Sequence, residues 1–127
     1  MSEKSAAQKL AIKEGQRFLL VNAPAGYQDL LADLPKDVSV VTEPSGTTDV
    51  IQCFVTSKAQ LEEVLPRLKA NLNRKGIFWV AYPKGTSKIK ADINRDIIRG
   101  YAQTIGMEAV AIFSIDDDWA CLRLKVV

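Results

Sequence analysis

The chain has 127 residues and a formal net charge of +2, from 17 basic and 15 acidic side chains. This length suits a single domain over residues 1–127 with a core that needs neither disulfides nor metal, and so small a charge gives no general attraction to nucleic acid or to a membrane. The sequence has no histidine, which excludes the usual general base, the usual zinc ligand and a Ser-His-Asp triad. We therefore predict no catalytic residue and no metal site.

The first half of the chain alternates between helix-forming and strand-forming segments. In chain order we predict a helix over Ser2–Leu10, a strand over Arg17–Val21, a helix over Tyr27–Leu34 and a strand over Val38–Val41. A parallel return normally needs a dozen or more residues, and the turn-rich stretch between Val41 and Asp49 is shorter. Either that stretch returns as extended chain, or Val38–Val41 is not a full parallel strand.

The second half continues the alternation and ends in two strands. In chain order we predict a strand over Asp49–Val55, a helix from Ser57 to about Leu72, a turn at Asn73–Gly76, a strand over Ile77–Ala81, a loop over Tyr82–Lys90, a helix from Asp92 or Asn94 through Ile105, and strands over Glu108–Ile115 and Ala120–Val126. Ser57 and Gln60 have the spacing of a capping box, and Gly106 suits the end of the last helix. The short connection Asp116–Trp119 predicts an antiparallel hairpin.

Strands that alternate with helices indicate an α/β fold. We predict a three-layer, Rossmann-like and mostly parallel sheet, with helices on both faces and a C-terminal antiparallel hairpin. Cys53 and Cys121 lie in apolar runs, so we expect buried and reduced thiols. No apolar run approaches the ~20 residues of a membrane span, and no secretory signal is visible, so we expect a cytoplasmic protein.

Ligands of open α/β sheets bind at the carboxyl ends of the parallel strands. That edge should collect the loop after the first strand, the Tyr82–Lys90 loop with the helix start that follows it, and the hairpin turn. The candidate ligand-binding residues there are Asn22, Lys84, Thr86, Ser87, Lys88, Asp92, Asn94, Arg95, Asp116 and Trp119. Lysines, hydroxyls and a helix N-terminus suit a phosphate or a carboxylate; the alternative is a solvated loop whose lysines offset the acidic turn. We expect Lys84 or Arg95 to face one of the acids of the turn, with Trp119 as an apolar wall.

The element order resembles the class I S-adenosylmethionine-dependent methyltransferase fold over nearly the whole chain. Ile12–Leu20 looks like the start of that fold's first strand, and Leu72–Val80 looks like the start of its fifth. A helix and a strand of the usual middle section are missing, which implies a truncated version. The first loop, Asn22–Gly26, has Pro24 where the family has an acid followed by G-x-G. A proline has no backbone donor and stiffens the chain, which disfavours S-adenosylmethionine, although Glu43 could replace the acid that binds the ribose.

A second resemblance is to a family of small bacterial proteins that have this truncated fold and no established activity. The matching stretches are Asn22–Pro24, Phe54–Ser57, Trp79–Lys88, Asp92–Asp96 and Asp116–Trp119. This resemblance implies the fold and leaves the function open.

Three functions remain after these arguments. We expect a non-catalytic domain without a cofactor, which binds an anionic small molecule or partner group at the carboxyl edge of the sheet. The alternatives are a minimal S-adenosylmethionine-dependent methyltransferase and a protein-interaction module. The sequence does not predict an oligomeric state.

Overall fold

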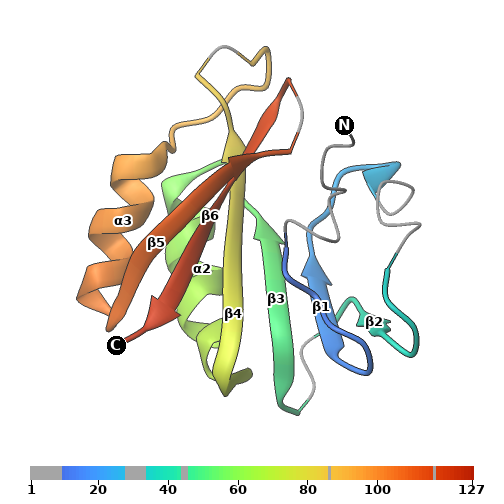
Figure 1. The fold of residues 1–127 in the computed structure, drawn as a ribbon. Coiled ribbons are helices and arrows are strands. Elements are labelled where there is room, and N and C mark those ends of the chain that lie inside the picture. The colour runs from blue at the N-terminus through green and yellow to red at the C-terminus, as the bar shows by residue number, and fades with distance from the viewer. Residues whose placement is uncertain (1–9, 28–33, 44–45, 86, 116) are drawn as a thin grey trace.

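The structure is a computed structural model, and it describes residues 10–27, 34–43, 46–85, 87–115 and 117–127 (Figure 1). Within these residues the strands are β1 (Arg17–Val21), β2 (Ser39–Val41), β3 (Thr48–Phe54), β4 (Leu72–Pro83), β5 (Met107–Ser114) and β6 (Trp119–Val126). The helices are α2 (Lys58–Lys69) and α3 (Arg95–Thr104), and neither is long and apolar enough to cross a membrane. The helices predicted over Ser2–Leu10 and Tyr27–Leu34 fall almost wholly outside the described residues.

The six strands form one sheet in the order β2-β1-β3-β4-β6-β5. β2, β1, β3 and β4 are mutually parallel, whereas β6 runs antiparallel to both β4 and β5. The predicted fold class is confirmed: this is an α/β, Rossmann-like and mostly parallel sheet with a C-terminal antiparallel hairpin. β2 has only three residues but pairs in parallel with β1, and the described residues of the chain from β2 to β3 contain no helix. Of the two alternatives predicted for the stretch between Val41 and Asp49, the structure therefore has the first: the described residues return from β2 to β3 without a helix.

The predicted turn at Asn73–Gly76 is wrong, because β4 begins at Leu72 and continues through these residues. α2 ends earlier than expected, at Lys69. A Cβ atom at Gly76 would lie 2.7 Å from Leu72 Cδ1 and 2.8 Å from the backbone oxygen of Asp49. The glycine is needed because the start of β3 passes close to it. A glycine within a strand often marks such a close approach of another backbone segment.

Local hydrogen bonds begin both helices where the sequence predicts them. The Ser57 hydroxyl accepts from the amide of Gln60 at 3.1 Å, and Gln60 Oε1 accepts from the amide of Thr56 at 2.9 Å. At α3, Asn94 Oδ1 accepts from the amide of Ile97 at 2.9 Å. These caps satisfy amides that have no partner inside a helix, so the strand-to-helix junctions at the carboxyl edge are well defined.

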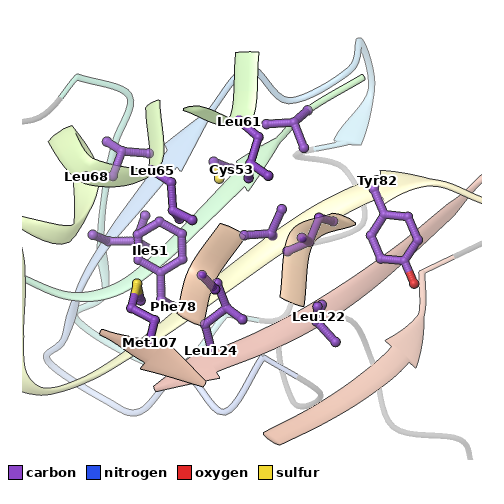
Figure 2. Close-up of a cluster of buried hydrophobic side chains, with 14 of the residues drawn as sticks. Ile51, Cys53, Leu61, Leu65, Leu68, Phe78, Tyr82, Met107, Leu122 and Leu124 are labelled. Carbon is purple, nitrogen blue, oxygen red and sulfur yellow. The ribbon is translucent and has the colours of Figure 1, made fainter. Parts of the chain in front are cut away.

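Each face of the sheet carries its own hydrophobic cluster. On the helical face, leucines of α2 and residues of α3 pack on alternate residues of the central strands (Figure 2); the residues labelled there are Ile51, Cys53, Leu61, Leu65, Leu68, Phe78, Tyr82, Met107, Leu122 and Leu124. The opposite face buries Phe18, Phe54, Trp79 and Trp119. Leu10, Ile12 and Tyr27 belong to that second cluster, so chain segments outside the sheet also cover this face.

Candidate functional site

The carboxyl end of β1 lies at the point where the strand order reverses. The chain leaves β1 toward β2 on one side, and it leaves β3 toward β4 on the other. Ligands of open α/β sheets bind in the crevice at such a switch point. A hollow of about 290 Å³ is found there, lined by Val21, Asn22, Gln60, Glu63, Val64, Arg67 and Leu68. We call it the switch-point hollow; β1 supplies one wall and α2, the helix after β3, supplies the other.

Asn22 forms the β1 side of this hollow in an unusual backbone conformation. Its φ is 59°, in the left-handed region that asparagine tolerates better than most residues. Gly26 has a φ of 82°, and a Cβ atom there would meet nothing within 4 Å. The Tyr27 amide donates to the carbonyl of Pro24 at 3.1 Å and closes the loop. Asn22 and Gly26 thus make the sharp backbone turns for which methyltransferase-like loops use glycine, despite the proline between them.

The α2 side of the hollow carries opposite charges one helical turn apart. Glu63 and Arg67 are both exposed, whereas Val64 and Leu68 beside them are partly or fully buried. A guanidinium binds a carboxylate well, and an acidic side chain at such a crevice suits ribose hydroxyls. Glu43 follows the end of β2, and its side chain is exposed, but it does not line the hollow. The α2 side of the hollow thus offers a carboxylate to hydroxyl donors and a guanidinium to an anionic group.

Of the candidates that lie among the described residues, Asn22 alone lines this hollow. Sequence reasoning missed Glu63 and Arg67, because charged residues on a helix usually form a solvated face. The strand order was the missing signal: it identifies β3 as the neighbour of β1, and therefore α2 as the helix that faces Asn22.

The loop after β4 meets the hairpin turn, as the strand directions require (Figure 1). The Lys84 amide donates to the carbonyl of Asp118 at 2.8 Å, and the Ser87 hydroxyl donates to Asp118 Oδ1 at 2.9 Å. The Lys84 ammonium donates to the hydroxyl of Ser114. A second hollow, of about 420 Å³, lies here, lined by Pro24, Ala25, Gly26, Tyr27, Ile89, Asp118 and Trp119. We call it the turn hollow.

Three of the remaining candidates lie at helix ends. Asp92 Oδ1 accepts from the amide of Lys58 at 2.8 Å and so supports the start of α2, and Asn94 caps α3. Arg95 lies near Tyr82 on the helical face: burial raises the pKa of the Tyr82 hydroxyl, and the charge of Arg95 opposes this shift.

The structure therefore does not bring the named residues into one anion site. Lys88 is exposed and lines neither hollow, and Thr86 and Asp116 lie outside the described residues. The described candidates are instead spread over the switch-point hollow (Asn22), the contact between the β4 loop and the hairpin turn (Lys84, Ser87 and Trp119), and the helix ends (Asp92, Asn94 and Arg95).

Both cysteines are free and fully buried, as predicted. Burial raises the pKa of the Cys53 thiol from 9.0 to about 12. Burial also raises the pKa of Cys121, and a hydrogen bond from the Gln52 side chain opposes that shift. Buried thiols of this kind are unreactive, so neither belongs to a site.

Comparison with known proteins gives a likeness in structure and none in sequence. No family model and no curated protein matches the chain. Among solved structures, the DhpI-SAH complex has a TM-score of 0.67 at 8% identity, over 96% of this chain and 82% of that one. A SAM-dependent methyltransferase from Aquifex aeolicus has a TM-score of 0.61 at 14% identity, over 94% of this chain and 87% of that one. The ribosomal protein L11 methylase from Lactobacillus delbrueckii subsp. bulgaricus has a TM-score of 0.62 at 11% identity, over 94% and 74%.

These likenesses correct two expectations from the sequence. A chain without a cofactor and without catalysis was expected, whereas the structures that it resembles include a methylase, a SAM-dependent methyltransferase and the DhpI complex with SAH. The argument from Pro24 considered only the residue types of the loop and not its backbone, which turns at Asn22 and Gly26. The likeness shows a methyltransferase-like fold, whereas the resemblance to the small bacterial family remains a prediction.

Proposed function

We propose that this chain is a minimal S-adenosylmethionine-dependent methyltransferase that binds its cofactor at the switch-point hollow. One observation carries the proposal: at the carboxyl end of β1, the left-handed Asn22 borders a hollow that also presents Glu63 and Arg67. Solved methyltransferases with this fold support it. The hollow of about 290 Å³ is at the lower end of the range for small-molecule sites.

The chain's own groups would bind and orient the cofactor. Arg67 would pair with its carboxylate, and Glu63 or Glu43 would accept from its ribose hydroxyls. The positive φ of Asn22 would let the backbone come close to the ligand. S-adenosylmethionine supplies an electrophilic methyl group when it is bound. Because the sequence has no histidine, any general base that assists the methyl acceptor must be a group other than imidazole.

Calorimetric titration with S-adenosylhomocysteine tests the proposal. We expect a dissociation constant on the order of micromolar for the unaltered chain, and a loss of at least about tenfold, which is about 1.4 kcal/mol, for Arg67→Ala. Glu63→Gln should weaken binding in the same direction. Glu62→Gln is the matched control, because Glu62 is exposed on the same helix and does not line the hollow. Absence of binding at millimolar ligand, or equal losses in Glu63→Gln and Glu62→Gln, would contradict the proposal.

A further inference from the structure

The first loop stands between the two hollows at the carboxyl edge. Asn22 lines the switch-point hollow, whereas Pro24 to Tyr27 line the turn hollow on the other side of the loop. A ligand in either hollow would therefore contact the same short segment. If the switch-point hollow binds the methyl donor, as proposed above, a methyl acceptor in the turn hollow would have to reach the donor past the first loop.

The walls of the turn hollow are aromatic, and the sheet holds them in place. Trp119 packs edge-on against Phe54 with ring centroids 5.1 Å apart, and Tyr27 packs against the same ring at 4.7 Å. The Tyr27 hydroxyl donates to Gln52 Oε1 at 2.8 Å inside the core. Ile89 and Pro24 add apolar surface. A preformed apolar wall of this kind suits a flat ring.

The described lining of the turn hollow carries a carboxylate, whereas the sequence predicts that an anion binds at this edge. Among the described residues that line it, Asp118 is the one charged side chain. Lys84 and Lys88 are not in the lining, and the Lys84 ammonium donates to Ser114. Ser87 donates to Asp118 Oδ1 and holds that carboxylate at the rim. A carboxylate beside an aromatic wall favours a cation or a hydrogen-bond donor and disfavours an anion.

We propose that the turn hollow binds a flat aromatic amine, with its ring against Trp119 and its nitrogen donating to Asp118. The amine's role as the methyl acceptor rests on the proposed function. The binding of the amine does not. The ammonium form that binds beside Asp118 first releases a proton to water, and the neutral amine that results is nucleophilic without an imidazole base. In the transfer, the nitrogen lone pair forms the bond to the methyl carbon, the electrons of the breaking carbon–sulfur bond stay on sulfur, and the displaced proton passes to Asp118 or to water.

Two probes with the same ring and opposite charge test the binding. Tryptamine and indole-3-acetate are titrated separately into the chain at pH 7, without cofactor, and binding is measured by calorimetry. We expect tryptamine to bind at least about tenfold more tightly than indole-3-acetate. Equal affinity for the two probes, or no binding of tryptamine at millimolar concentration, would overturn the proposal.

Variants of neighbouring carboxylates locate the amine. Asp118→Asn retains an oxygen that accepts from Ser87 and removes the charge, and it should weaken tryptamine binding at least about tenfold. Asp117→Asn is the matched control, because Asp117 is exposed and does not line the hollow. Equal tryptamine affinity in the two variants would overturn the assignment. Thermal unfolding of both should match that of the unaltered chain.

Binding of S-adenosylhomocysteine separates this inference from the proposed function. Asp118→Asn should leave that affinity unchanged, because Asp118 does not line the switch-point hollow. If tryptamine binds through Asp118 and S-adenosylhomocysteine does not bind at all, the amine site is supported and the methyltransferase proposal is contradicted. If S-adenosylhomocysteine binds and tryptamine does not, the reverse holds.

Discussion

The two faces of the sheet are built differently. The helical face is covered by the leucines of α2 and by residues of α3. The opposite face contains four buried aromatic rings of the sheet, with Phe113 packed against them, and a buried chain of polar contacts. In that chain, Tyr27 donates to Gln52, and Gln52 Nε2 approaches Cys121 Sγ at 3.6 Å. Buried polar groups fix a unique geometry when they are satisfied. The helical face therefore carries the charged wall of the switch-point hollow on α2, whereas the opposite face positions the first loop, which borders both hollows.

The largest expected effect concerns the helical face alone. Leu65 is fully buried between α2 and the sheet, so Leu65→Ala should lower the free energy of unfolding by about 2–5 kcal/mol. The conservative change Leu65→Met should cost less than about 1.5 kcal/mol. Urea unfolding measures both. A loss below about 1 kcal/mol in Leu65→Ala would mean that α2 packs less tightly than the structure indicates.

The next effect concerns the polar chain of the opposite face. Gln52→Leu leaves the Tyr27 hydroxyl buried without its acceptor, which should cost about 1–3 kcal/mol. Tyr27→Phe removes the other partner. The double variant should cost less than the sum of the two single changes, because an apolar pair leaves no unsatisfied group. Additive losses in urea unfolding would show that the two side chains do not stabilise each other.

Each face also buries one thiol, and these thiols make the free energy of unfolding depend on pH in the alkaline range. Burial raises the pKa of Cys53 from 9.0 to about 12, so the folded chain keeps a proton that the unfolded chain releases. The contribution of the protonated Cys53 thiol to the free energy of unfolding is complete below pH 9. It falls by about 1.4 kcal/mol per pH unit as the pH rises from 9 toward 12. Cys53→Ala should reduce this slope when unfolding is measured across that range. An unchanged slope would assign the pH dependence to other groups, of which Cys121 on the opposite face is the first to test.

The smallest effect concerns the start of α2, the helix that carries Glu63 and Arg67. Ser57→Ala removes the oxygen that accepts from the Gln60 amide, and it should cost about 1 kcal/mol. Ser57→Asn, which can accept the same hydrogen bond, should cost less. Thermal unfolding compares the two variants. Equal losses would show that the cap contributes through something other than this hydrogen bond.

Local patterns in the sequence predicted the elements whose stabilising contacts are local. The apolar run of β1 matches its observed bounds, and Ser57, Asn94 and Gly106 mark helix ends by hydrogen bonds and backbone angles within a few residues. Strand direction alone also predicted that the β4 loop would meet the hairpin turn. These features depend on short-range geometry or on the direction of the chain, both of which can be read from residue order.

Only the tertiary structure determined which residues come together at the candidate site. It made Gly76 part of a strand, because the β3 backbone passes beside it, and it placed Asp92 on the amide of Lys58, 34 residues away. It also brought α2 next to Asn22, and so placed Glu63 and Arg67 at the switch point. The sequence by itself determines which segments are strands and where helices begin, since propensity and capping act over a few residues. Which charges come to share a hollow depends on strand order and on packing between distant segments.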